Sequence, residues 1–421
     1  MTLKDVVLKN KKIITLFVLL CLLAYLFWPI YHALMYKDFA PMLGQASITL
    51  PPTQPQQSIV HDRQYQAVSD KAIKALKQHR QKVKAPGYTA AVAINGKTIW
   101  SGSVGFADIE RNVPMTPATQ LRVGSTSKAI TATGLALLVQ SGQLDLDAPI
   151  SRYLTPLPND KWRDITTRQL ASHMAGIPHY GENTEILGLL TTLKADQHFS
   201  NVTNALTLFD ESDVLFEPGE QFEYSSLGTV LLSAVMQGVA KQSYQSWMQQ
   251  KVFTPLNMLQ TTYEKDDHCL PNLAQFYWRD YAVPDRYKSW MEVDLSHRLA
   301  GGGWVSTSND LVKLGQAFMN ASFIDESVQK AFWTVQKLNN GEENWQGYGI
   351  GWRIHSLDLG DGFEEQLYMH HGGVSAGAQS FLMALPKYKM SIAINANIKT
   401  NEFSEFNEVS YTLARLFINA L

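Results

Sequence analysis

The chain has 421 residues, of which 45% are hydrophobic and 18% are charged, values that are typical of a globular protein. This length is enough for one large domain or two ordinary ones. The formal net charge of -2 provides no basic excess for the phosphate backbone of a nucleic acid, so we expect no nucleic-acid partner.

The N-terminus combines lysines with an uncharged apolar segment. Residues 1–12 contain four lysines, and residues 13–30 contain no charge. Eighteen helical residues span about 27 Å, close to the thickness of the hydrocarbon core of a bilayer. Because positive flanks stay in the cytoplasm, residues 1–12 are predicted to be a cytoplasmic tail and residues 13–36 a transmembrane signal anchor. A cleaved signal peptide is the alternative, although no clear small-x-small cleavage site follows the apolar segment.

This orientation predicts a single-pass protein of the bacterial inner membrane, with its remaining part in the periplasm. Residues 37–61 are predicted to be a linker, because the segment "GQASITLPPTQPQQSIV" is rich in Pro and Gln. Residues 62–421 then form the folded domain.

The predicted elements of this domain place strands at both ends and helices between them. Residues 62–84 predict an amphipathic helix, and Asn95-Gly96 between two apolar runs predicts a hairpin. A long apolar helix is predicted within 120–142 and a mainly helical region within 145–290. Strand-like runs return within 365–398, and a final helix is predicted over 402–420. This order predicts an α+β fold, with one antiparallel sheet built from both termini and a helical region inserted.

The segment Gly373-Val374-Ser375-Ala376-Gly377 matches G-x-S-x-G, the nucleophile elbow of α/β-hydrolases. An elbow needs a helix directly after the Ser, within a parallel sheet, and a His further along the chain. Strand-like runs follow Ser375 instead, and no His follows His371. We therefore expect Ser375 not to be a nucleophile.

A better candidate is the S-x-x-K sequence from Ser125 to Lys128, at the start of the predicted helix. Positions i and i+3 share a helix face, with Cβ atoms about 5–6 Å apart, so the amine can reach the hydroxyl. A Ser hydroxyl needs a base to become a good nucleophile, and a Lys can be that base if burial or a nearby cation lowers its pKa. Taken alone, the four residues also fit a capping Ser followed by a surface Lys.

Two further motifs follow in order: Tyr224-Ser225-Ser226 before an apolar helix, and His371-Gly372-Gly373 on a predicted strand. Together with S-x-x-K, they resemble the serine β-lactamase and penicillin-binding-protein superfamily, in particular its class C-like branch. The segments "ITTRQLASHMAGIPHY", "LFEPGEQFEYSS" and "AGGGWVSTSNDLVKLGQAF" match that branch as well. The resemblance covers roughly residues 65–420 and implies a β-lactamase/transpeptidase-like fold.

This resemblance also implies the roles of individual residues. Ser125 would be the acylated nucleophile, and Lys128 and Tyr224 would handle its proton, with Tyr224 as base and then as acid. The backbone N–H groups of Ser125 and Val374 would form the oxyanion hole. The further residues implied in substrate binding are Ser226, His371, Gly372 and Gly373.

Two positions depart from the family's pattern. Ser226 stands where the family often has Asn, so the amide that would hold the Lys is missing. His371 stands where β-lactamases usually have Lys, and an unperturbed His is mostly neutral at pH 7. We expect His371 to gain charge as the pH falls from about 8 to 6 and then to attract substrate carboxylates.

The sequence therefore predicts a membrane-anchored serine hydrolase that cleaves an amide or ester through an acyl-serine intermediate, with peptidase or esterase action favoured. Its expected partners are a small-molecule or peptide substrate and the membrane. The alternatives are β-lactamase or penicillin-binding activity, or a catalytically weak binding or scaffold protein of the same fold. No cofactor is expected. No metal site is expected either, because the histidines show no ligand spacing such as H-E-x-x-H.

Overall fold

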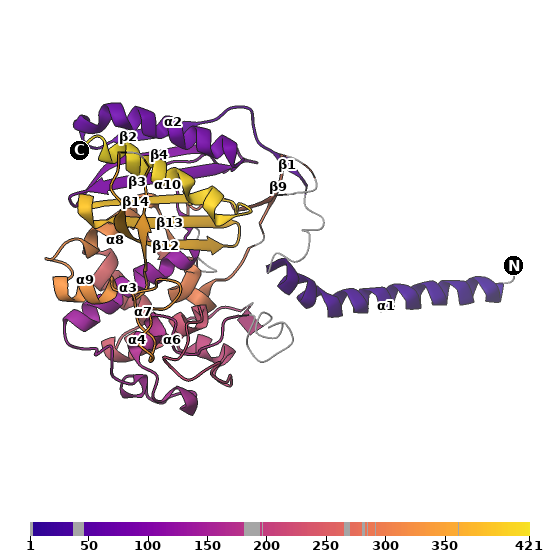
Figure 1. The fold of residues 1–421 in the computed structure, drawn as a ribbon. Coiled ribbons are helices and arrows are strands. Elements are labelled where there is room, and N and C mark those ends of the chain that lie inside the picture. Colours follow the sequence, from indigo (N-terminus) through magenta and orange to yellow (C-terminus); the bar gives the residue numbers. More distant parts are fainter. Residues whose placement is uncertain are drawn as a thin grey trace.

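One large antiparallel sheet organises the domain (Figure 1). The computed structural model describes residues 3–36, 46–180, 194–195, 197–264, 270–279, 283, 285–290, 292–360 and 362–421. The strands of the large sheet lie in the order β11 (Arg353–Leu357), β12 (Gln366–Ser375), β13 (Ala378–Leu385), β14 (Met390–Ala396), β3 (Gly87–Ile94), β4 (Lys97–Asp108) and β2 (Gln56–Val60). The C-terminal strands therefore lie beside the N-terminal hairpin, and the predicted α+β fold is confirmed.

The hairpin of β3 and β4 forms at the predicted turn. Asn95 and Gly96 both adopt left-handed backbone angles, with φ of 52° and 80°. A two-residue type I′ turn requires positive φ at both central positions, which explains why Asn-Gly occurs there. Ile94 pairs with Lys97 across this turn.

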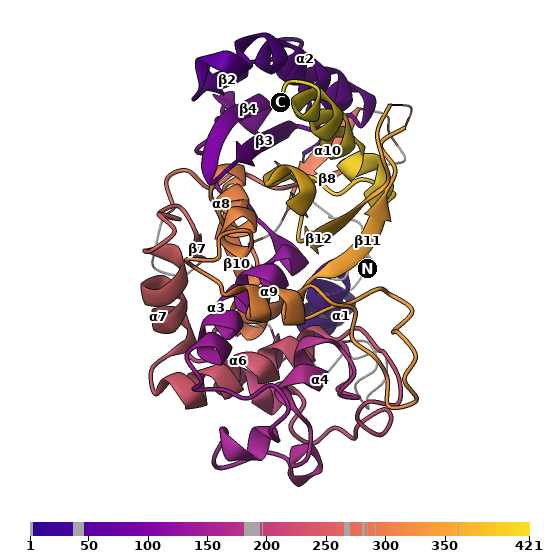
Figure 2. The same ribbon diagram turned by 60° about the vertical axis from the view of Figure 1, so that its left-hand side comes forward.

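Helices cover both faces of the large sheet. The helices of the domain are α2 (Gln66–Lys82), α3 (Ser127–Gln140), α4 (Thr167–Ala171), α6 (Ser226–Ala240), α7 (Tyr244–Met248), α8 (Ser308–Phe318), α9 (Glu326–Phe332) and α10 (Phe403–Ile418). Figure 2 shows α2 and α10 together on one side of the sheet and α8, with the inserted helical region, on the other. Along β3, Val92 packs on the side of α2 and α10, whereas Ala91 and Ala93 belong to the core of the helical side.

Short strands connect this sheet to the helical region. The strand β5 (Val113–Pro114) pairs with β4. One three-stranded sheet has the order β1 (Ile48–Thr49), β9 (Arg286–Ser289) and β8 (Tyr277–Arg279). The other has the order β6 (Leu121–Arg122), β10 (Trp304–Ser306) and β7 (Thr262–Tyr263). The β6 strand leads directly into the segment that carries Ser125. The pairing of Arg122 with Val305 therefore fixes the approach to this residue.

The predicted boundary between linker and domain at residue 62 is wrong. Residues 56–60 form β2, which pairs with β4 from Gln56 opposite Val104 to Val60 opposite Trp100. The Trp100 indole N–H donates a hydrogen bond of 2.9 Å to Ser58 Oγ. The Pro- and Gln-rich composition conceals this strand because it lies at the edge of the sheet, where three of its five residues are exposed and two are half-buried, so they need not be apolar.

The N-terminal helix α1 (Leu3–Tyr36) projects away from the domain in Figure 1, although Tyr31, near its end, packs against a cluster of the domain. Its segment Asn10–Tyr31 has a mean hydropathy of 2.5, and none of its strongest apolar window is buried within the protein. The segment is long and apolar enough to cross a membrane, and its position also fits a signal sequence.

Candidate active site

Ser125 lies in the short 3-10 turn η2 (Gly124–Thr126), which runs directly into α3. Two glycines allow this turn to approach β12 closely. A Cβ atom built on Gly373 would lie 2.8 Å from Ser125 N, and one built on Gly124 would lie 2.5 Å from Val374 O. The backbones of Ser125 and Val374 therefore lie side by side, as an oxyanion hole formed by their N–H groups requires.

Lys128, in the first turn of α3, points back to the nucleophile. Its Nζ atom lies 3.3 Å from Ser125 Oγ, 2.9 Å from Ser226 Oγ and 2.7 Å from the Gly301 carbonyl oxygen. The side chain is 2% exposed. Ser226 thus contacts the Lys amine that a family Asn would hold, so the expected loss of this contact does not occur. The sequence did not predict the contact with Gly301, because every residue has a backbone carbonyl and no side chain marks this one.

The environment of Lys128 disfavours its charged form. Burial lowers the pKa of the Lys128 amine well below its usual value, and the nearby Arg353 and Arg298 guanidinium groups lower it further. A neutral amine has two N–H donors and one lone pair. The Gly301 carbonyl and Ser226 Oγ can accept these two N–H groups, which leaves the lone pair for the Ser125 hydroxyl proton.

Tyr224 shows the opposite shift. Burial raises the pKa of its hydroxyl to about 12, although Arg353 and a hydrogen bond with Ser125 oppose this change. The Lys128 amine lies 4.6 Å from the centre of the Tyr224 ring. At neutral pH the phenol therefore keeps its proton and can donate it, whereas Lys128 is the group able to accept one.

His371 lies on a strand, β12, as predicted, but its side chain is buried rather than exposed to a substrate. Its side chain is 0% exposed, with Nδ1 2.8 Å from the Gly372 carbonyl oxygen and Nε2 2.9 Å from the Tyr348 hydroxyl. Because a carbonyl can only accept, Nδ1 carries the proton and Nε2 accepts from Tyr348. Burial, then Arg353 and Lys128, lower the pKa of His371 well below its usual value. The predicted gain of charge between pH 8 and 6 is therefore wrong, because the ring is desolvated among cations.

Two further histidines support the start of α6. The backbone N–H of Ser225 donates to His173 Nδ1 at 3.3 Å, and that of Ser226 donates to His179 Nδ1 at 3.2 Å. Burial lowers the pKa of His173 well below its usual value and that of His179 to about 4, consistent with neutral rings that accept these bonds. No sequence motif indicates this role, because each ring accepts a hydrogen bond from a backbone N–H far along the chain.

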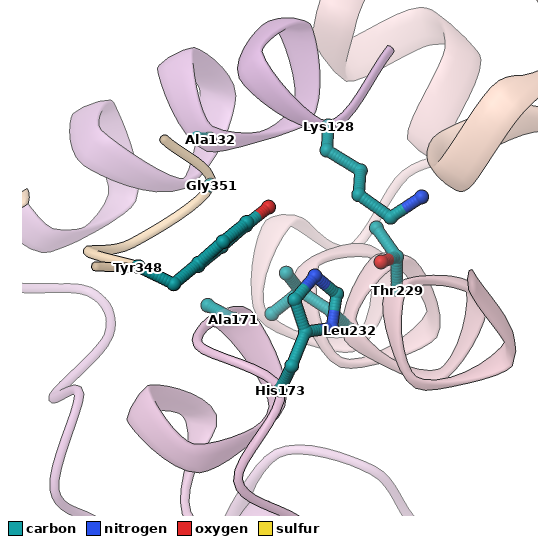
Figure 3. A pocket seen from close by; sticks show the side chains of 8 residues that line it. All are labelled: Lys128, Ala132, Ala171, His173, Thr229, Leu232, Tyr348 and Gly351. Atoms are coloured by element: carbon teal, nitrogen blue, oxygen red, sulfur yellow. The ribbon is translucent and has the colours of Figure 1, made fainter. Parts of the chain in front are cut away.

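A small cavity lies behind Lys128. Figure 3 shows the Lys128 side chain extending from α3 toward Thr229 of α6, with His173 and Tyr348 on the other sides. Its volume is about 10 Å³, close to the room that one water molecule needs. This cavity is too small for a substrate.

A second, open cavity of about 390 Å³ lies in front of Ser125. Among the predicted site residues, Ser125, Tyr224, Gly372 and Val374 line it. The sequence analysis missed the remaining part of its wall, made by Arg353, His370, Phe381, Phe403 and Asn407. These come from β11, β12, β13 and α10, so no local motif unites them.

Ser375 lies at the end of β12, and β13 follows it, so the structure lacks the helix that an elbow requires. Its side chain is buried, and Arg298 donates to its Oγ over 3.4 Å. Within the described ranges no group of three His, Cys, Asp or Glu residues could hold a metal ion.

Comparisons with known proteins agree with this geometry. The profile of the Beta-lactamase family matches residues 72–414. The mitochondrial serine beta-lactamase-like protein LACTB of Bos taurus is 28% identical over 423 residues, which cover 80% of this chain and 75% of that protein.

Solved structures share the fold. The D-amino acid amidase of Ochrobactrum anthropi, in complex with L-phenylalanine amide, superposes with a TM-score of 0.69 at 24% identity, covering 84% of this chain and 99% of the amidase. The octameric penicillin-binding protein homologue of Pyrococcus abyssi gives a TM-score of 0.66 at 21% identity, covering 83% and 77%. A family profile that spans most of the domain, together with this shared fold, shows that the chain belongs to the β-lactamase family of serine hydrolases.

Proposed function

We propose that this protein is a serine hydrolase that cleaves an amide or ester through an acyl-Ser125 intermediate, with peptidase or esterase action favoured over β-lactam hydrolysis. The observation that carries the proposal is the position of Lys128. Its buried amine lies 3.3 Å from Ser125 Oγ, and its pKa is lowered well below the usual value. A neutral amine at this distance is a general base for the hydroxyl.

In the acylation step, Ser125 Oγ forms a bond to the carbonyl carbon of the substrate while Lys128 takes the hydroxyl proton. The N–H groups of Ser125 and Val374 stabilise the oxyanion, an effect of roughly 3–4 kcal/mol for one donor. The Tyr224 hydroxyl protonates the leaving group, and the proton held by Lys128 restores the phenol. A water molecule then attacks the acyl carbon, releases the acid and returns a proton to Ser125.

An active-site fluorophosphonate tests this assignment. The wild-type protein should be labelled, and Ser125→Ala should abolish labelling because no nucleophile remains. Ser375→Ala is the matched control, since its buried hydroxyl lies outside the open cavity. Labelling that persists without Ser125 would refute the assignment. A folded wild-type protein that is never labelled would favour a binding or scaffold role.

A panel of substrates then separates the possible activities. p-Nitrophenyl esters, amides of D- and L-amino acids and nitrocefin should be compared at equal concentration. We expect Ser125-dependent turnover of an ester or amide to exceed that of nitrocefin. Faster turnover of nitrocefin would instead establish β-lactamase activity.

We also propose that α1 anchors the protein in the bacterial inner membrane, with the hydrolase domain in the periplasm. The proposal is supported by the mean hydropathy of Asn10–Tyr31 and by the lysines that precede this segment. Alkaline phosphatase fused to the C-terminus should be active in a bacterium. An inactive fusion would place the domain in the cytoplasm, and a soluble mature form that begins after residue 36 would show cleavage.

A further inference from the structure

A buried arginine lies between the strand that leads to the nucleophile and the turn that follows β12. Arg122 belongs to β6, three residues before Ser125, and it is 4% exposed. Its backbone pairs with Val305 of β10, so a strand fixes the base of its side chain. Its Nη1 atom donates a hydrogen bond of 3.0 Å to the Ala376 carbonyl oxygen. One side chain therefore connects β6 to the end of β12.

The place of Ala376 in the chain connects this contact to the oxyanion hole. Ala376 lies in the turn between β12 and β13, two residues after Val374, whose N–H we propose as an oxyanion donor. Arg122, at the other end of the contact, comes three residues before Ser125, which has the second proposed N–H. Each donor is therefore within three residues of one end of the hydrogen bond. A displacement of either end changes the separation of the two N–H groups.

The guanidinium of Arg122 is held in one orientation. Its Nε and Nη2 atoms donate to the two carboxylate oxygens of Glu264 over 2.6 and 2.9 Å. The centre of the Phe276 ring lies 4.1 Å from the guanidinium carbon. A bidentate carboxylate and an aromatic face both fix the plane of a guanidinium, whose donors form a rigid fork. The contact of Arg122 with Ala376 is therefore made in a fixed direction.

The turn that contains Ala376 also packs against Phe276. Its second residue, Gly377, has a φ of 67°, a backbone angle that glycine adopts readily. A Cβ atom built on Gly377 would lie 2.8 Å from Phe276 Cβ, so the turn lies close against this side chain. Ala376 and Phe276 belong to the same apolar cluster. Phe276 thus contacts both the turn and the guanidinium of Arg122, and the three parts pack as one unit.

We propose that Arg122 is a positioning residue for the oxyanion hole. By holding the Ala376 carbonyl, it sets the distance of the Val374 N–H group from the N–H group of Ser125. Oxyanion donors act at about 2.7–3.1 Å from the developing charge, so a small displacement of the turn lowers the reaction rate. The inference rests on the proposed hydrolase function, because only a developing oxyanion uses both donors. It adds to the site a residue that does not touch the substrate.

The test removes the contact with Ala376 in a protein that still folds. Replacing Arg122 alone would leave the half-buried Glu264 carboxylate without this partner, which is strongly destabilising. The double variant Arg122→Met/Glu264→Leu avoids this problem, since apolar replacement of both members of a buried pair is often neutral for stability. Arg168→Met/Asp147→Asn is the matched control. Arg168 binds both carboxylate oxygens of Asp147 over 2.6 and 2.8 Å, and neither residue lines the open cavity.

Two esters that differ in one atom measure the oxyanion hole. One is a neutral p-nitrophenyl ester, and the other is its thiono analogue, in which sulfur replaces the carbonyl oxygen. Sulfur is a weak hydrogen-bond acceptor, so two well-placed N–H groups favour the oxygen ester. In the Arg122/Glu264 variant we expect the ratio of the two kcat/KM values to fall by about 10-fold or more, as part of the 10²- to 10³-fold effect of one donor. The control variant should keep the wild-type ratio.

The ratio is the deciding quantity because it separates positioning from stability. A variant that is only less stable contains less folded enzyme, and this loss affects both esters equally. Melting temperatures show how stable each variant is. The inference is overturned by an unchanged ratio in the folded Arg122/Glu264 variant, by an equal fall in the control, or by a wild-type ratio near one.

Hydrogen exchange of the full-length protein separates this inference from the hydrolase function, because it needs no turnover. We expect the backbone amides of the turn between β12 and β13 to exchange faster in the Arg122/Glu264 variant than in the wild type and the control. If neither ester is hydrolysed but the turn exchanges faster, the holding of the turn by Arg122 stands and the hydrolase function falls. If the esters are hydrolysed and neither the ratio nor the exchange changes, the inference falls and the hydrolase function stands.

Discussion

Lys128 and Tyr224 are both near the nucleophile, and their environments separate their roles. Burial disfavours the charged form of each group, which lowers the pKa of the amine and raises that of the phenol to about 12. The Lys128 amine is therefore suited to accept a proton, and the Tyr224 phenol is suited to donate one. The S-x-x-K spacing allowed Lys128 as the base, whereas the family resemblance implied Tyr224. We propose Lys128, because its amine lies 3.3 Å from Ser125 Oγ and burial lowers its pKa.

This assignment predicts a pH dependence. Below its pKa, Lys128 is protonated and cannot accept the Ser125 proton, so kcat/KM for a neutral ester should rise with pH and then level off. Arg353 and Arg298 lower the pKa of Lys128, so replacing either with Gln should move the rising limb to higher pH. Initial rates across pH 5 to 10 measure the limb. A limb that moves to lower pH in these variants would contradict the role of Lys128.

Tyr224→Phe removes a hydroxyl and keeps the ring. Acid–base groups contribute about 10²- to 10⁴-fold, so kcat/KM should fall by that factor. The melting temperature should change little, because Phe fills nearly the same space among His173 and Tyr348. Turnover of an ester and thermal unfolding are the two measurements. Unchanged turnover in a folded variant would exclude Tyr224 as the proton donor.

At the scale of elements, the contact between η2 and β12 brings together the two N–H groups that we propose as the oxyanion hole. Gly373→Ala would place a methyl group 1.9 Å from the Val123 carbonyl oxygen and 2.8 Å from Ser125 N, so the turn and the strand must separate. Loss of one oxyanion donor costs about 10²- to 10³-fold, and we expect fluorophosphonate labelling to slow by at least that factor.

Gly228→Ala is the matched control for this prediction. A Cβ on Gly228 would meet its nearest neighbour at 3.5 Å, an ordinary contact, and the residue lies within α6. Ala is favoured over Gly inside a helix, so this variant should label normally and unfold at the same or a higher temperature. Equal labelling of the Gly373 and Gly228 variants would show that the close approach of η2 to β12 is not needed.

At the scale of the whole molecule, we propose that α1 anchors the protein in a membrane, whereas β2 belongs to the large sheet of the domain. A chain of residues 46–421 retains β2 and should be soluble without detergent and labelled at Ser125. A chain of residues 62–421 loses β2, the Trp100–Ser58 hydrogen bond and five paired positions along β4. Each kcal/mol lost lowers the melting temperature by about 2–4 °C in a large domain, so we expect a fall of at least that size. Equal melting temperatures would restore the predicted boundary at 62.

The sequence by itself determined what depends on neighbours along the chain. Asn95-Gly96 fixed the hairpin because a two-residue turn needs two positive φ angles, and the spacing of Ser125 and Lys128 put both on one side of a helix start. Ordered motifs then indicated the family. The tertiary structure decided the chemistry of these groups, because desolvation and charge come from residues far apart in the chain. Burial, and then Arg353 and Arg298, lower the pKa of Lys128, and His371 is buried against Tyr348. No local sequence pattern shows which cations lie near a group or how deeply the group is buried. The direction of each pKa shift therefore follows only from the fold.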